Sequence, residues 1–445
     1  MMSFEKIRYA SITDVGVKRS HNQDACAAQP AADENVWRVQ GHIFVVADGM
    51  GGHAVGEKAS AKAIRDIPLT YSKHVGQEGV VSAIRRAFTE ANADIFDIGI
   101  KNPEFKGLGT TTTALFLRPE GAWIGHVGDS RAYRIRSGKV EQLTFDHSWV
   151  WEIARRQGID PDQLGDFKKN VIVRSLGPDE EVEVDIEGPH PLIPGDSFLL
   201  CSDGLSNEVT ADEMGAVVST MPPEEAAKFL IALANVRGGR DNITCLIVQV
   251  PPDERAASSK NILLVKGPGF LRKALRAWDR IVPWSYTFLL LGSLCAMAVL
   301  ILKSQDLPGV VPVFFAATVL ILAGIVGLIL HLKHGAHSAT DAASSNNNGE
   351  LHVYKGYSFD IGQPLFDRFA AKEAEIKIEL DKRPNTIDWS KYQKLSDEAA
   401  LNLGKSEPLA AFRYRCLAFQ LLASAYNQDR NKEESFKPNW DSQHR

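Results

Sequence analysis

The sequence predicts an α+β fold for roughly the first 250 of its 445 residues. Strand-like apolar runs fall into two groups, one before and one after a pair of helical segments. Such grouping, without the regular alternation of βαβ units, is typical of α+β domains. Beyond this region the composition changes to a polar linker, two long apolar segments and a helical tail.

The helical pair is expected over residues 55–67 and 78–98. Apolar residues recur at helical spacing along one face of the second segment: Val81, Ile84, Phe88 and Ile95. Strands are expected where short apolar runs end at turn residues, near 4–13, 42–48, 111–117, 122–128, 131–136, 181–187, 197–202 and 243–250.

Acidic residues stand at the ends of four of these runs. Asp48, Asp129 and Asp203 each close an apolar run, and Asp241 opens the last one. In an antiparallel sheet the end of one strand lies beside the start of its neighbour, so the four carboxylates are expected to gather. Carboxylates that close together cannot all stay ionised without a cation between them, so a metal centre is expected.

The type of ligand narrows the choice of metal. Carboxylate and carbonyl oxygens suit Mg²⁺, Mn²⁺ or Ca²⁺, and no Cys/His cluster has zinc spacing. Two divalent ions ~3.5–4 Å apart are the usual device for phosphate-ester hydrolysis. The alternative is that each Asp-Gly pair is only a hairpin turn, which is the better explanation for any one of them alone.

Seven motifs, in this order and at this spacing, resemble those of bacterial metal-dependent protein phosphatases of type 2C. The resemblance covers residues 1 to about 250. The motifs are Thr13-Asp14-Val15-Gly16 with Arg19-Ser20-His21-Asn22-Gln23-Asp24-Ala25, Ala47-Asp48-Gly49-Met50-Gly51-Gly52-His53, Gly109-Thr110-Thr111-Thr112, Val127-Gly128-Asp129-Ser130-Arg131-Ala132-Tyr133, Leu143-Thr144-Phe145-Asp146-His147-Ser148-Trp149, Cys201-Ser202-Asp203-Gly204-Leu205 and Gly238-Gly239-Arg240-Asp241-Asn242-Ile243-Thr244.

The resemblance implies an antiparallel two-sheet β-sandwich flanked by helices, and it implies roles for single residues. Asp48 would bridge two Mn²⁺ or Mg²⁺ ions, with the Gly49 carbonyl completing one shell, and Asp203 and Asp241 would hold the other ion. Asp24 would act mostly through metal-bound water. Asp129, together with Asp203, would form a looser third metal site. Arg19 would hold the substrate phosphate, because the geometry of a guanidinium group suits a phosphate.

The general acid is less well marked. A His follows the Asp-Gly pair directly in eukaryotic relatives, whereas Met50 stands there in this sequence, as in bacterial members. His53 is then the nearest group able to protonate the leaving oxygen, with a polar helix-start residue as the alternative. Cys201 lies inside an apolar strand and is interpreted as a core residue, not a nucleophile.

The phosphatase-like part covers residues 1–252. The rest of the chain, 253–445, divides into segments of different composition. Residues 253–283 form a linker and a basic amphipathic stretch, and 284–302 and 309–332 are apolar enough to be expected as two transmembrane helices. A flexible linker is expected over 333–361. The tail, 362–445, is expected to contain helices near 362–382 and 408–427 that pack on each other.

Charge and cysteine content predict where the chain works. Basic residues flank the expected hairpin, which places both its ends, the catalytic domain and the tail in the cytoplasm, with lipid bilayer as a partner. Five cysteines without a pairing pattern fit a reducing compartment. A net charge of −5 argues against nucleic acid as a partner.

The sequence therefore predicts a membrane-tethered phosphatase of phosphoserine and phosphothreonine proteins that opposes a Ser/Thr kinase. The alternative is a catalytically silent, phosphatase-like sensor that binds phosphoproteins. The intact set of candidate residues speaks against the sensor: Arg19, Asp24, Asp48, Asp129, Asp203 and Asp241. A metal-dependent nuclease is more remote, because no basic groove is apparent.

Overall fold

The computed structural model describes most of the phosphatase-like region and the C-terminal tail. The described residues are 7–51, 56–105, 107–164, 171–251, 284–305, 311–315, 317–322, 351–382 and 387–434. They form two compact units, and the larger one contains residues up to 152, 166–253 and the chain from Gly349 onward.

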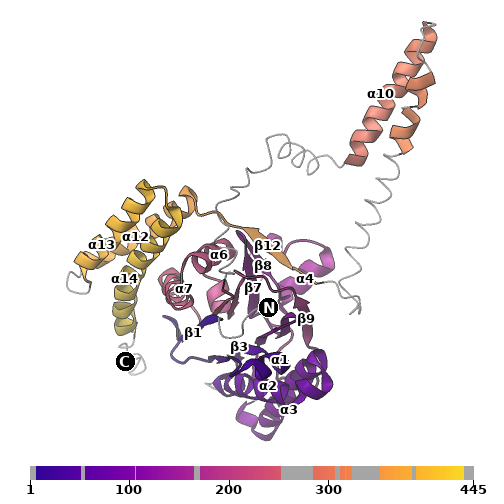
Figure 1. Ribbon diagram of the computed structural model, residues 1–445. Coiled ribbons are helices and arrows are strands. Elements are labelled where there is room, and N and C mark those ends of the chain that lie inside the picture. The colour runs from indigo at the N-terminus through magenta and orange to yellow at the C-terminus, as the bar shows by residue number, and fades with distance from the viewer. Residues whose placement is uncertain are drawn as a thin grey trace, which may run out of the picture. The chain divides into compact units, whose positions relative to one another are not determined.

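Two antiparallel sheets form the centre of the larger unit (Figure 1). The first has the strand order β1-β11-β10-β7-β8-β12. Its strands are β1 (Arg8–Asp14), β7 (Arg131–Arg136), β8 (Lys139–Gln142), β10 (Ser197–Cys201), β11 (Ile243–Gln249) and β12 (Lys355–Ser358). The second has the order β2-β3-β5-β6-β9, with β4 (Gly109–Thr110) paired to β3. Its strands are β2 (Asp24–Gln29), β3 (His42–Met50), β5 (Thr112–Arg118), β6 (Gly121–Val127) and β9 (Asp185–His190).

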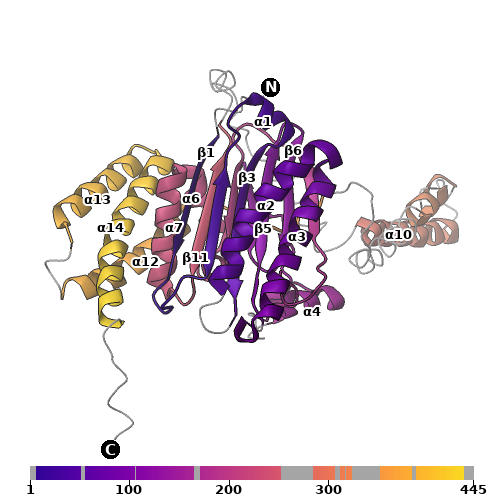
Figure 2. The same cartoon turned by 90° about the horizontal axis from the view of Figure 1, so that it is seen from below.

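The sheets pack face to face through a shared apolar layer. Phe44 and Leu115 from the second sheet and Phe198, Leu200 and Leu246 from the first lie in one buried cluster. Strand residues alternate between the two faces of a sheet, so the opposite faces carry a second set of apolar residues that helices must cover. Figure 2 shows the resulting layers, with helices outside both sheets. The predicted α+β sandwich is thus confirmed.

Helices α2 (Gly56–Glu78) and α3 (Val80–Lys101) cover the second sheet, where Ile67, Tyr71, Ile84 and Phe88 are buried. The predicted pair of helices is confirmed, but α2 continues well past the expected end at residue 67. Pro68 lies inside it and is buried. The continuation is held by packing, because Tyr71 and Val75 contact the sheet beneath.

Helices α6 (Ala211–Thr220) and α7 (Pro223–Arg237) cover the first sheet. The shorter elements are α1 (Glu34–Val39), α4 (Trp149–Gln157), α5 (Asp203–Ser206) and two 3₁₀ turns at Pro103–Phe105 and Pro161–Leu164. Helix α7 was not predicted, because most of its residues are apolar and buried and it has no polar face that would reveal a helical period.

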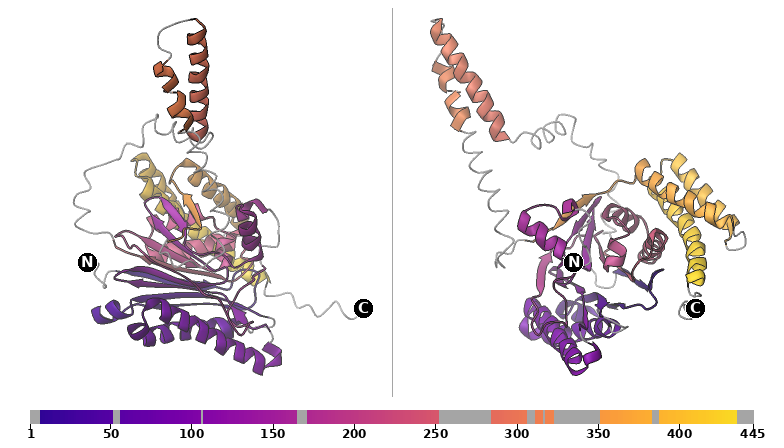
Figure 3. Two further views of the ribbon diagram at one scale, coloured as in Figure 1. Left: turned by 90° about the vertical axis from the view of Figure 1, so that its right-hand side faces the viewer. Right: turned by 180° about the vertical axis from the view of Figure 1, so that it is seen from behind.

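The C-terminal tail adds a further layer outside α6 and α7. It contains α12 (Gln363–Leu380), α13 (Trp389–Gly404) and α14 (Pro408–Glu434), seen beside α6 and α7 in Figure 3. The tail packs on α7 as well as on itself, since Phe229 of α7 meets Phe369 and Phe419 at ring distances of 5.6 Å. The flexible linker expected over 333–361 differs from the structure in its described part, where strand β12 pairs with β8.

The smaller unit contains α10 (Trp284–Ser304), where the first transmembrane helix was expected. Within the described parts of the chain, no helix combines the length and the apolar character needed to cross a membrane. The expected transmembrane hairpin is therefore not confirmed. Most of the second expected span, 309–332, lies outside the described residues.

Candidate metal and phosphate site

Two carboxylates face each other where strands β2 and β3 begin and end. Asp24 is the first residue of β2, and its register partner on β3 is Asp48. Antiparallel pairing brings the start of one strand beside the end of the next, although no strand was expected from the sequence at residues 24–29. The backbone of Asp48 is held by Thr110, whose hydroxyl donates to the Asp48 carbonyl at 2.9 Å, and by Thr111, whose hydroxyl accepts from the Asp48 amide at 3.2 Å.

Asp203 and Asp241 come from the first sheet at the same end of the sandwich. Asp203 follows β10 and begins α5, and Asp241 precedes β11. The two loops approach so closely that a Cβ on Gly204 would lie 2.0 Å from the carbonyl oxygen of Asn242. Only glycine fits there, which explains the Asp-Gly pair without a hairpin turn.

Asp129 lies in the connection from β6 to β7, which passes from one sheet to the other. It is 6% exposed. The preceding Gly128 has φ of 116°, a left-handed conformation that favours glycine, and a side chain there would also collide with Thr111. The turn thus places Asp129 between the two sheets.

Burial and mutual repulsion disfavour the charged forms of these groups. Burial, together with the charges of Asp203 and Asp241, raises the pKa of Asp24 to about 7. Burial and the charge of Asp241 raise the pKa of Asp203 to about 6. The pKa values of Asp48 and Asp129 are raised well above their ordinary value, first by burial and then by neighbouring carboxylates. The five carboxylates therefore share one electrostatic environment.

Several carboxylate oxygens at this site have no protein partner in the structure. Among the described residues, Asp24 Oδ1, Asp129 Oδ1 and Asp203 Oδ1 are buried and accept no hydrogen bond. A buried oxygen without a donor costs free energy that a hard cation would recover. The donor set, all oxygen, suits Mg²⁺ or Mn²⁺. The same described residues contain no group of three or more His, Cys, Asp or Glu side chains already arranged to hold a metal ion.

The backbone beside Asp48 is equally crowded. A Cβ on Gly49 would lie 2.2 Å from the Gly56 carbonyl oxygen and 2.6 Å from that of Gln23. Glycine is therefore required here by close packing of backbone on backbone. Its carbonyl is the group that the family resemblance implies as a ligand in one metal shell.

Arg19 lies at the edge of the site. Its Nη2 donates to Asp241 Oδ2 at 2.9 Å, and about half of its side chain is exposed, 49%. The loop that carries it is held by Asn242, whose Nδ2 donates to the carbonyl oxygens of Val15 and His21 at 2.9 Å each. A guanidinium with free donors next to a carboxylate cluster is well placed to meet a phosphate. His53, the proposed general acid, lies outside the described residues.

Two supporting residues were not predicted. The hydroxyls of Ser202 and Thr244 each donate to Asp24 Oδ2 at 2.7 Å. They orient one oxygen of Asp24 and leave the other free. In the sequence, only their positions near predicted ligands could have indicated this role. Ser202 directly precedes Asp203, and Thr244 follows Asp241-Asn242-Ile243.

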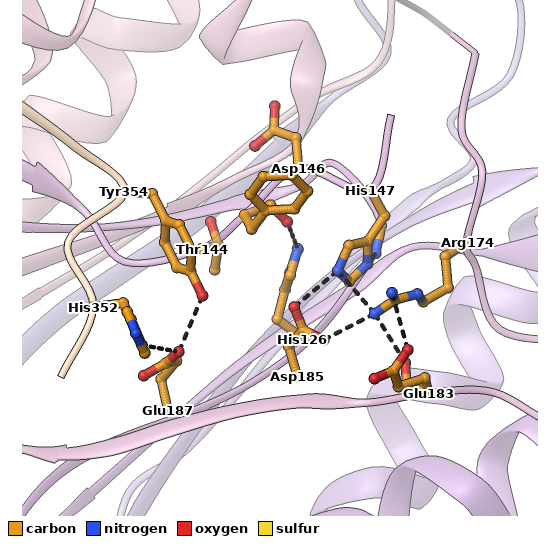
Figure 4. Close-up of polar contacts among 12 residues, drawn as sticks. His126, Thr144, Asp146, His147, Arg174, Glu183, Asp185, Glu187, His352 and Tyr354 are labelled. Carbon is orange, nitrogen blue, oxygen red and sulfur yellow. Dashed lines mark hydrogen bonds and ion pairs between the residues drawn. The ribbon is translucent and has the colours of Figure 1, made fainter. Parts of the chain in front are cut away.

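His147, which belongs to the fifth motif, supports the turn that carries Asp129. The amide of Gly128 donates to His147 Nδ1 at 2.9 Å, and the amide of His147 donates to the Gly128 carbonyl at 2.7 Å. On its other side His147 Nε2 meets Asp185 Oδ2 at 3.0 Å, and Arg174 donates to Asp185 Oδ1 at 2.8 Å (Figure 4). Although burial opposes it, these contacts lower the pKa of Asp185 to about 2.

Cys201 and two further histidines also lie in this part of the domain. Burial raises the pKa of the Cys201 thiol to about 12, so it stays protonated in the core, as expected. His126 is buried and contacts Thr113 and the Phe145 carbonyl. His21 is exposed beside Ser20.

Comparison with known proteins agrees with this site. The sequence model of the family described as Protein phosphatase 2C matches residues 17–233. The serine/threonine phosphatase stp of Listeria monocytogenes is 36% identical over 242 residues, which are 53% of this chain and 93% of that protein. The chain belongs to the protein phosphatase 2C family.

Other members of the protein phosphatase 2C family are similar over the same extent. Protein phosphatase PhpP of Streptococcus pneumoniae is 34% identical over 249 residues, 55% of this chain and 97% of that protein. The crystal structure of serine/threonine phosphatase Stp1 from Staphylococcus aureus superimposes with a TM-score of 0.50 at 27% identity, covering 57% of this chain and 98% of that one. The chain is accordingly a phosphoprotein phosphatase. The matches leave nearly half of it, including the C-terminal tail, outside the family region.

Proposed function

We propose that this protein removes phosphate from phosphoserine and phosphothreonine in proteins at a centre of two Mn²⁺ or Mg²⁺ ions, with a looser third ion. Asp48 and the Gly49 carbonyl, Asp203, Asp241 and, through water, Asp24 would hold the ions. Asp129 would hold the third ion together with Asp203. Bound ions of this kind lower the pKa of a water molecule and neutralise charge on the transferred phosphoryl group.

The remaining work falls to the protein's own side chains. Arg19 holds the substrate phosphate through the donors that it does not spend on Asp241, and this contact orients the phosphorus toward the carboxylates. Ser202 and Thr244 keep Asp24 in one orientation. His53 would protonate the leaving serine or threonine oxygen.

One observation carries the proposal. Asp24 and Asp48 are register partners, and three buried carboxylate oxygens, on Asp24, Asp129 and Asp203, have no donor within the described ranges of the chain. A protein gains nothing from concentrating negative charge in this way unless a cation binds there. A phosphoprotein-binding sensor would need the Arg19 side of the site, but not this cluster.

The test is phosphate release by the full-length protein from a phosphothreonine peptide with Mn²⁺, with Mg²⁺ and with EDTA. Release that requires the metal and is lost in Asp48→Asn is the expected result. Asp94→Asn is the matched control, since Asp94 is an exposed carboxylate on α3 that pairs with Lys62. A folded protein that binds the phosphopeptide but never turns it over would favour the sensor instead.

A place at the cytoplasmic face of a membrane is part of the same proposal. It rests on the sequence and on the exposed apolar side chains of α10, among them Leu291, Leu294, Met297 and Leu300 at 50–69% exposure. Separation of membrane and soluble fractions from cells that express the full chain tests it, with deletion of 284–332 as the control. Recovery of the full chain in the soluble fraction would contradict the tether.

A Ser/Thr kinase whose products this enzyme dephosphorylates is the proposed functional partner. Loss of the phosphatase should then raise the phosphothreonine content of the kinase's substrates, and Asp48→Asn should fail to reverse it. The effect is measured by comparing the phosphoproteomes of the wild-type strain and of a strain that lacks the phosphatase or carries only its Asp48→Asn variant.

A further inference from the structure

The C-terminal tail returns to the phosphatase domain and pairs with the edge of its first sheet. The family match ends at residue 233, yet residues from Gly349 onward belong to the same compact unit as the two sheets. Strand β12 adds to the edge of the first sheet, with Lys355 opposite Gln142 and Ser358 opposite Lys139. Just before it, the amide of Tyr354 donates to the Gln142 carbonyl at 2.9 Å.

Tyr354 is held from two directions. Its hydroxyl donates to Glu187 Oε1 of β9 at 3.0 Å, and His352 Nδ1 meets the same oxygen at 3.1 Å (Figure 4). Its ring packs edge-on against Phe145 with centroids 5.8 Å apart. Phe145 in turn meets the Trp151 ring of α4 at 5.1 Å, so an aromatic row runs from the tail to the start of α4.

Phe145 belongs to a short segment that also supports the site. Two residues later, His147 exchanges two hydrogen bonds with Gly128, which precedes Asp129. Between them, Asp146 accepts from Arg131 Nη2 at 2.7 Å, and Arg131 lies two residues after Asp129. The segment 145–147 is therefore linked to the Asp129 turn on both sides of the carboxylate.

The two faces of this segment are covered by different parts of the chain. On the side of the phosphatase domain, Asp185 meets His147, and the Phe145 carbonyl meets His126 at 2.9 Å. On the other side, Tyr354 covers the Phe145 ring and the Lys355 ammonium lies 5.1 Å above the Trp151 ring. Removing the Tyr354 ring would take one aromatic neighbour from Phe145, which also contacts the rings of Trp151 and His147, and the segment would gain freedom to move.

We propose that Tyr354 is a positioning residue for the phosphatase reaction. Its ring holds Phe145 and thereby the His147–Gly128 contact that orients Asp129. This inference rests on the proposed function, because it assigns a residue outside the family region to the same site. Tyr354 touches neither substrate nor reacting atoms and acts only through Phe145.

The test compares three variants of the full-length protein. Tyr354→Ala removes the ring, and Tyr354→Phe keeps the ring but removes the hydroxyl that binds Glu187. Arg413→Ala is the matched control for docking of the tail, because Arg413 of α14 pairs with Glu225 of α7 at 2.8 Å, on the other face of the first sheet from the aromatic row. Steady-state kinetics on the phosphothreonine peptide and hydrogen exchange at residues 145–149 are measured for each.

Loss of the ring should lower kcat with little effect on KM, because Arg19 and the substrate contacts are untouched. Groups directly behind a metal ligand change activity by about 10–100-fold, so a residue one contact further out should cost roughly 3–10-fold in kcat. The Tyr354→Phe variant should retain at least about half of the wild-type kcat. The Arg413→Ala variant should have the same kcat as the wild type. The amides of His147 and Trp149 should exchange at least about tenfold faster in Tyr354→Ala alone.

Unchanged kcat and exchange in Tyr354→Ala would overturn the inference while wild-type activity still supported the phosphatase. An equal loss in Tyr354→Phe would also overturn it, because the hydroxyl and not the ring would then matter. Equal losses in Arg413→Ala would show a general effect of tail docking and would overturn it too. If the wild-type protein had no activity, but the Tyr354→Ala variant still exchanged faster at residues 145–149, the proposed function would be refuted. The structural link between Tyr354 and the segment 145–147 would still hold.

Discussion

At the scale of single residues, the site consists of carboxylates whose ionised forms are disfavoured by burial and mutual repulsion. Asp24 and Asp48 are opposite each other on neighbouring strands, and Ser202 and Thr244 stabilise only one oxygen of Asp24. The sequence predicted carboxylate ligands, because Asp48, Asp129, Asp203 and Asp241 each follow or precede an apolar run. It did not reveal the two hydroxyl donors, because they lie 178 and 220 residues from Asp24 along the chain.

Asp48→Asn should reduce phosphate release by more than about 100-fold, since even groups behind a metal ligand cost 10–100-fold. The fold should be retained, because replacing a buried carboxylate of raised pKa by an amide removes repulsion. Activity assays and circular dichroism on the same preparation measure both effects. Activity within about tenfold of wild type would refute the role of Asp48 as a bridging ligand.

The metal-free protein should become more stable as the pH falls. The pKa values of Asp24 and Asp203 are raised from 3.8 to about 7 and about 6 by burial and neighbouring carboxylates. Between these values and 3.8 the folded state binds more protons than the unfolded state, so the free energy of unfolding increases as the pH decreases.

In EDTA, the midpoint of thermal unfolding should therefore rise between about pH 7.5 and about pH 5.5, a gain on the order of 1–3 kcal/mol. Saturating Mn²⁺ is the control, because protons then compete with the ion and the trend should reverse. Calorimetry gives both curves. If the unfolding midpoint in EDTA decreased as the pH decreased, the carboxylates would not repel one another in the folded protein.

Arg19→Lys should raise KM for the phosphothreonine peptide about tenfold with a smaller change in kcat. A lysine keeps the charge but cannot contact two phosphate oxygens in one plane. Arg65→Lys is a matched control on the exposed face of α2, where Arg65 pairs with Asp66. An unchanged KM would mean that the phosphate is bound by another group.

At the scale of secondary structure elements, the sequence predicted helices α2 and α3 but not helices α7 and α13 or strand β12. Helices α2 and α3 cover a sheet on one side only, so their apolar residues recur at helical spacing. Helix α7 is buried by β1 and β11 on one side and by α14 on the other, so it carries no polar stripe. The short strand β12 contains no apolar pattern and is held by its pairing with β8.

Phe369→Ala in α12 should lower the free energy of unfolding by about 3–5 kcal/mol, as for other buried phenylalanines. Phe369 is 1% exposed and meets both Phe229 and Phe412 at 5.6 Å. Leu409→Ala is the control, because Leu409 is 58% exposed. Urea denaturation followed by tryptophan fluorescence measures the change, and a loss below about 1 kcal/mol would show that α12 does not pack on α7.

At the scale of the whole molecule, the phosphatase domain and the C-terminal tail share one core. Leu230 and Leu233 of α7 lie in the same buried cluster as Phe412 and Leu422 of α14. The sequence correctly predicted two of the three tail helices, but it placed their packing only among themselves. Self-packing and docking on α7 require the same apolar residues, so composition does not distinguish them.

Truncation after Val250 should lower the midpoint of thermal unfolding by at least about 5 °C, because it exposes the apolar face of α7. Adding residues 349–445 as a separate chain should restore part of the loss, which excludes an effect of chain length alone. Differential scanning calorimetry measures both states. Identical midpoints for the truncated and full-length proteins would mean that the tail contributes nothing to the stability of the domain.

The sequence by itself determined the α+β class, the carboxylates at the strand ends and the resemblance to the type 2C phosphatases. These properties depend on residue type and on spacing between near neighbours. Only the tertiary structure decided that Asp24 is opposite Asp48, that Ser202 and Thr244 hold it, and that Tyr354 lies on Phe145. Such contacts join residues far apart in the chain, and they are set by how the sheets and helices bury their apolar faces together.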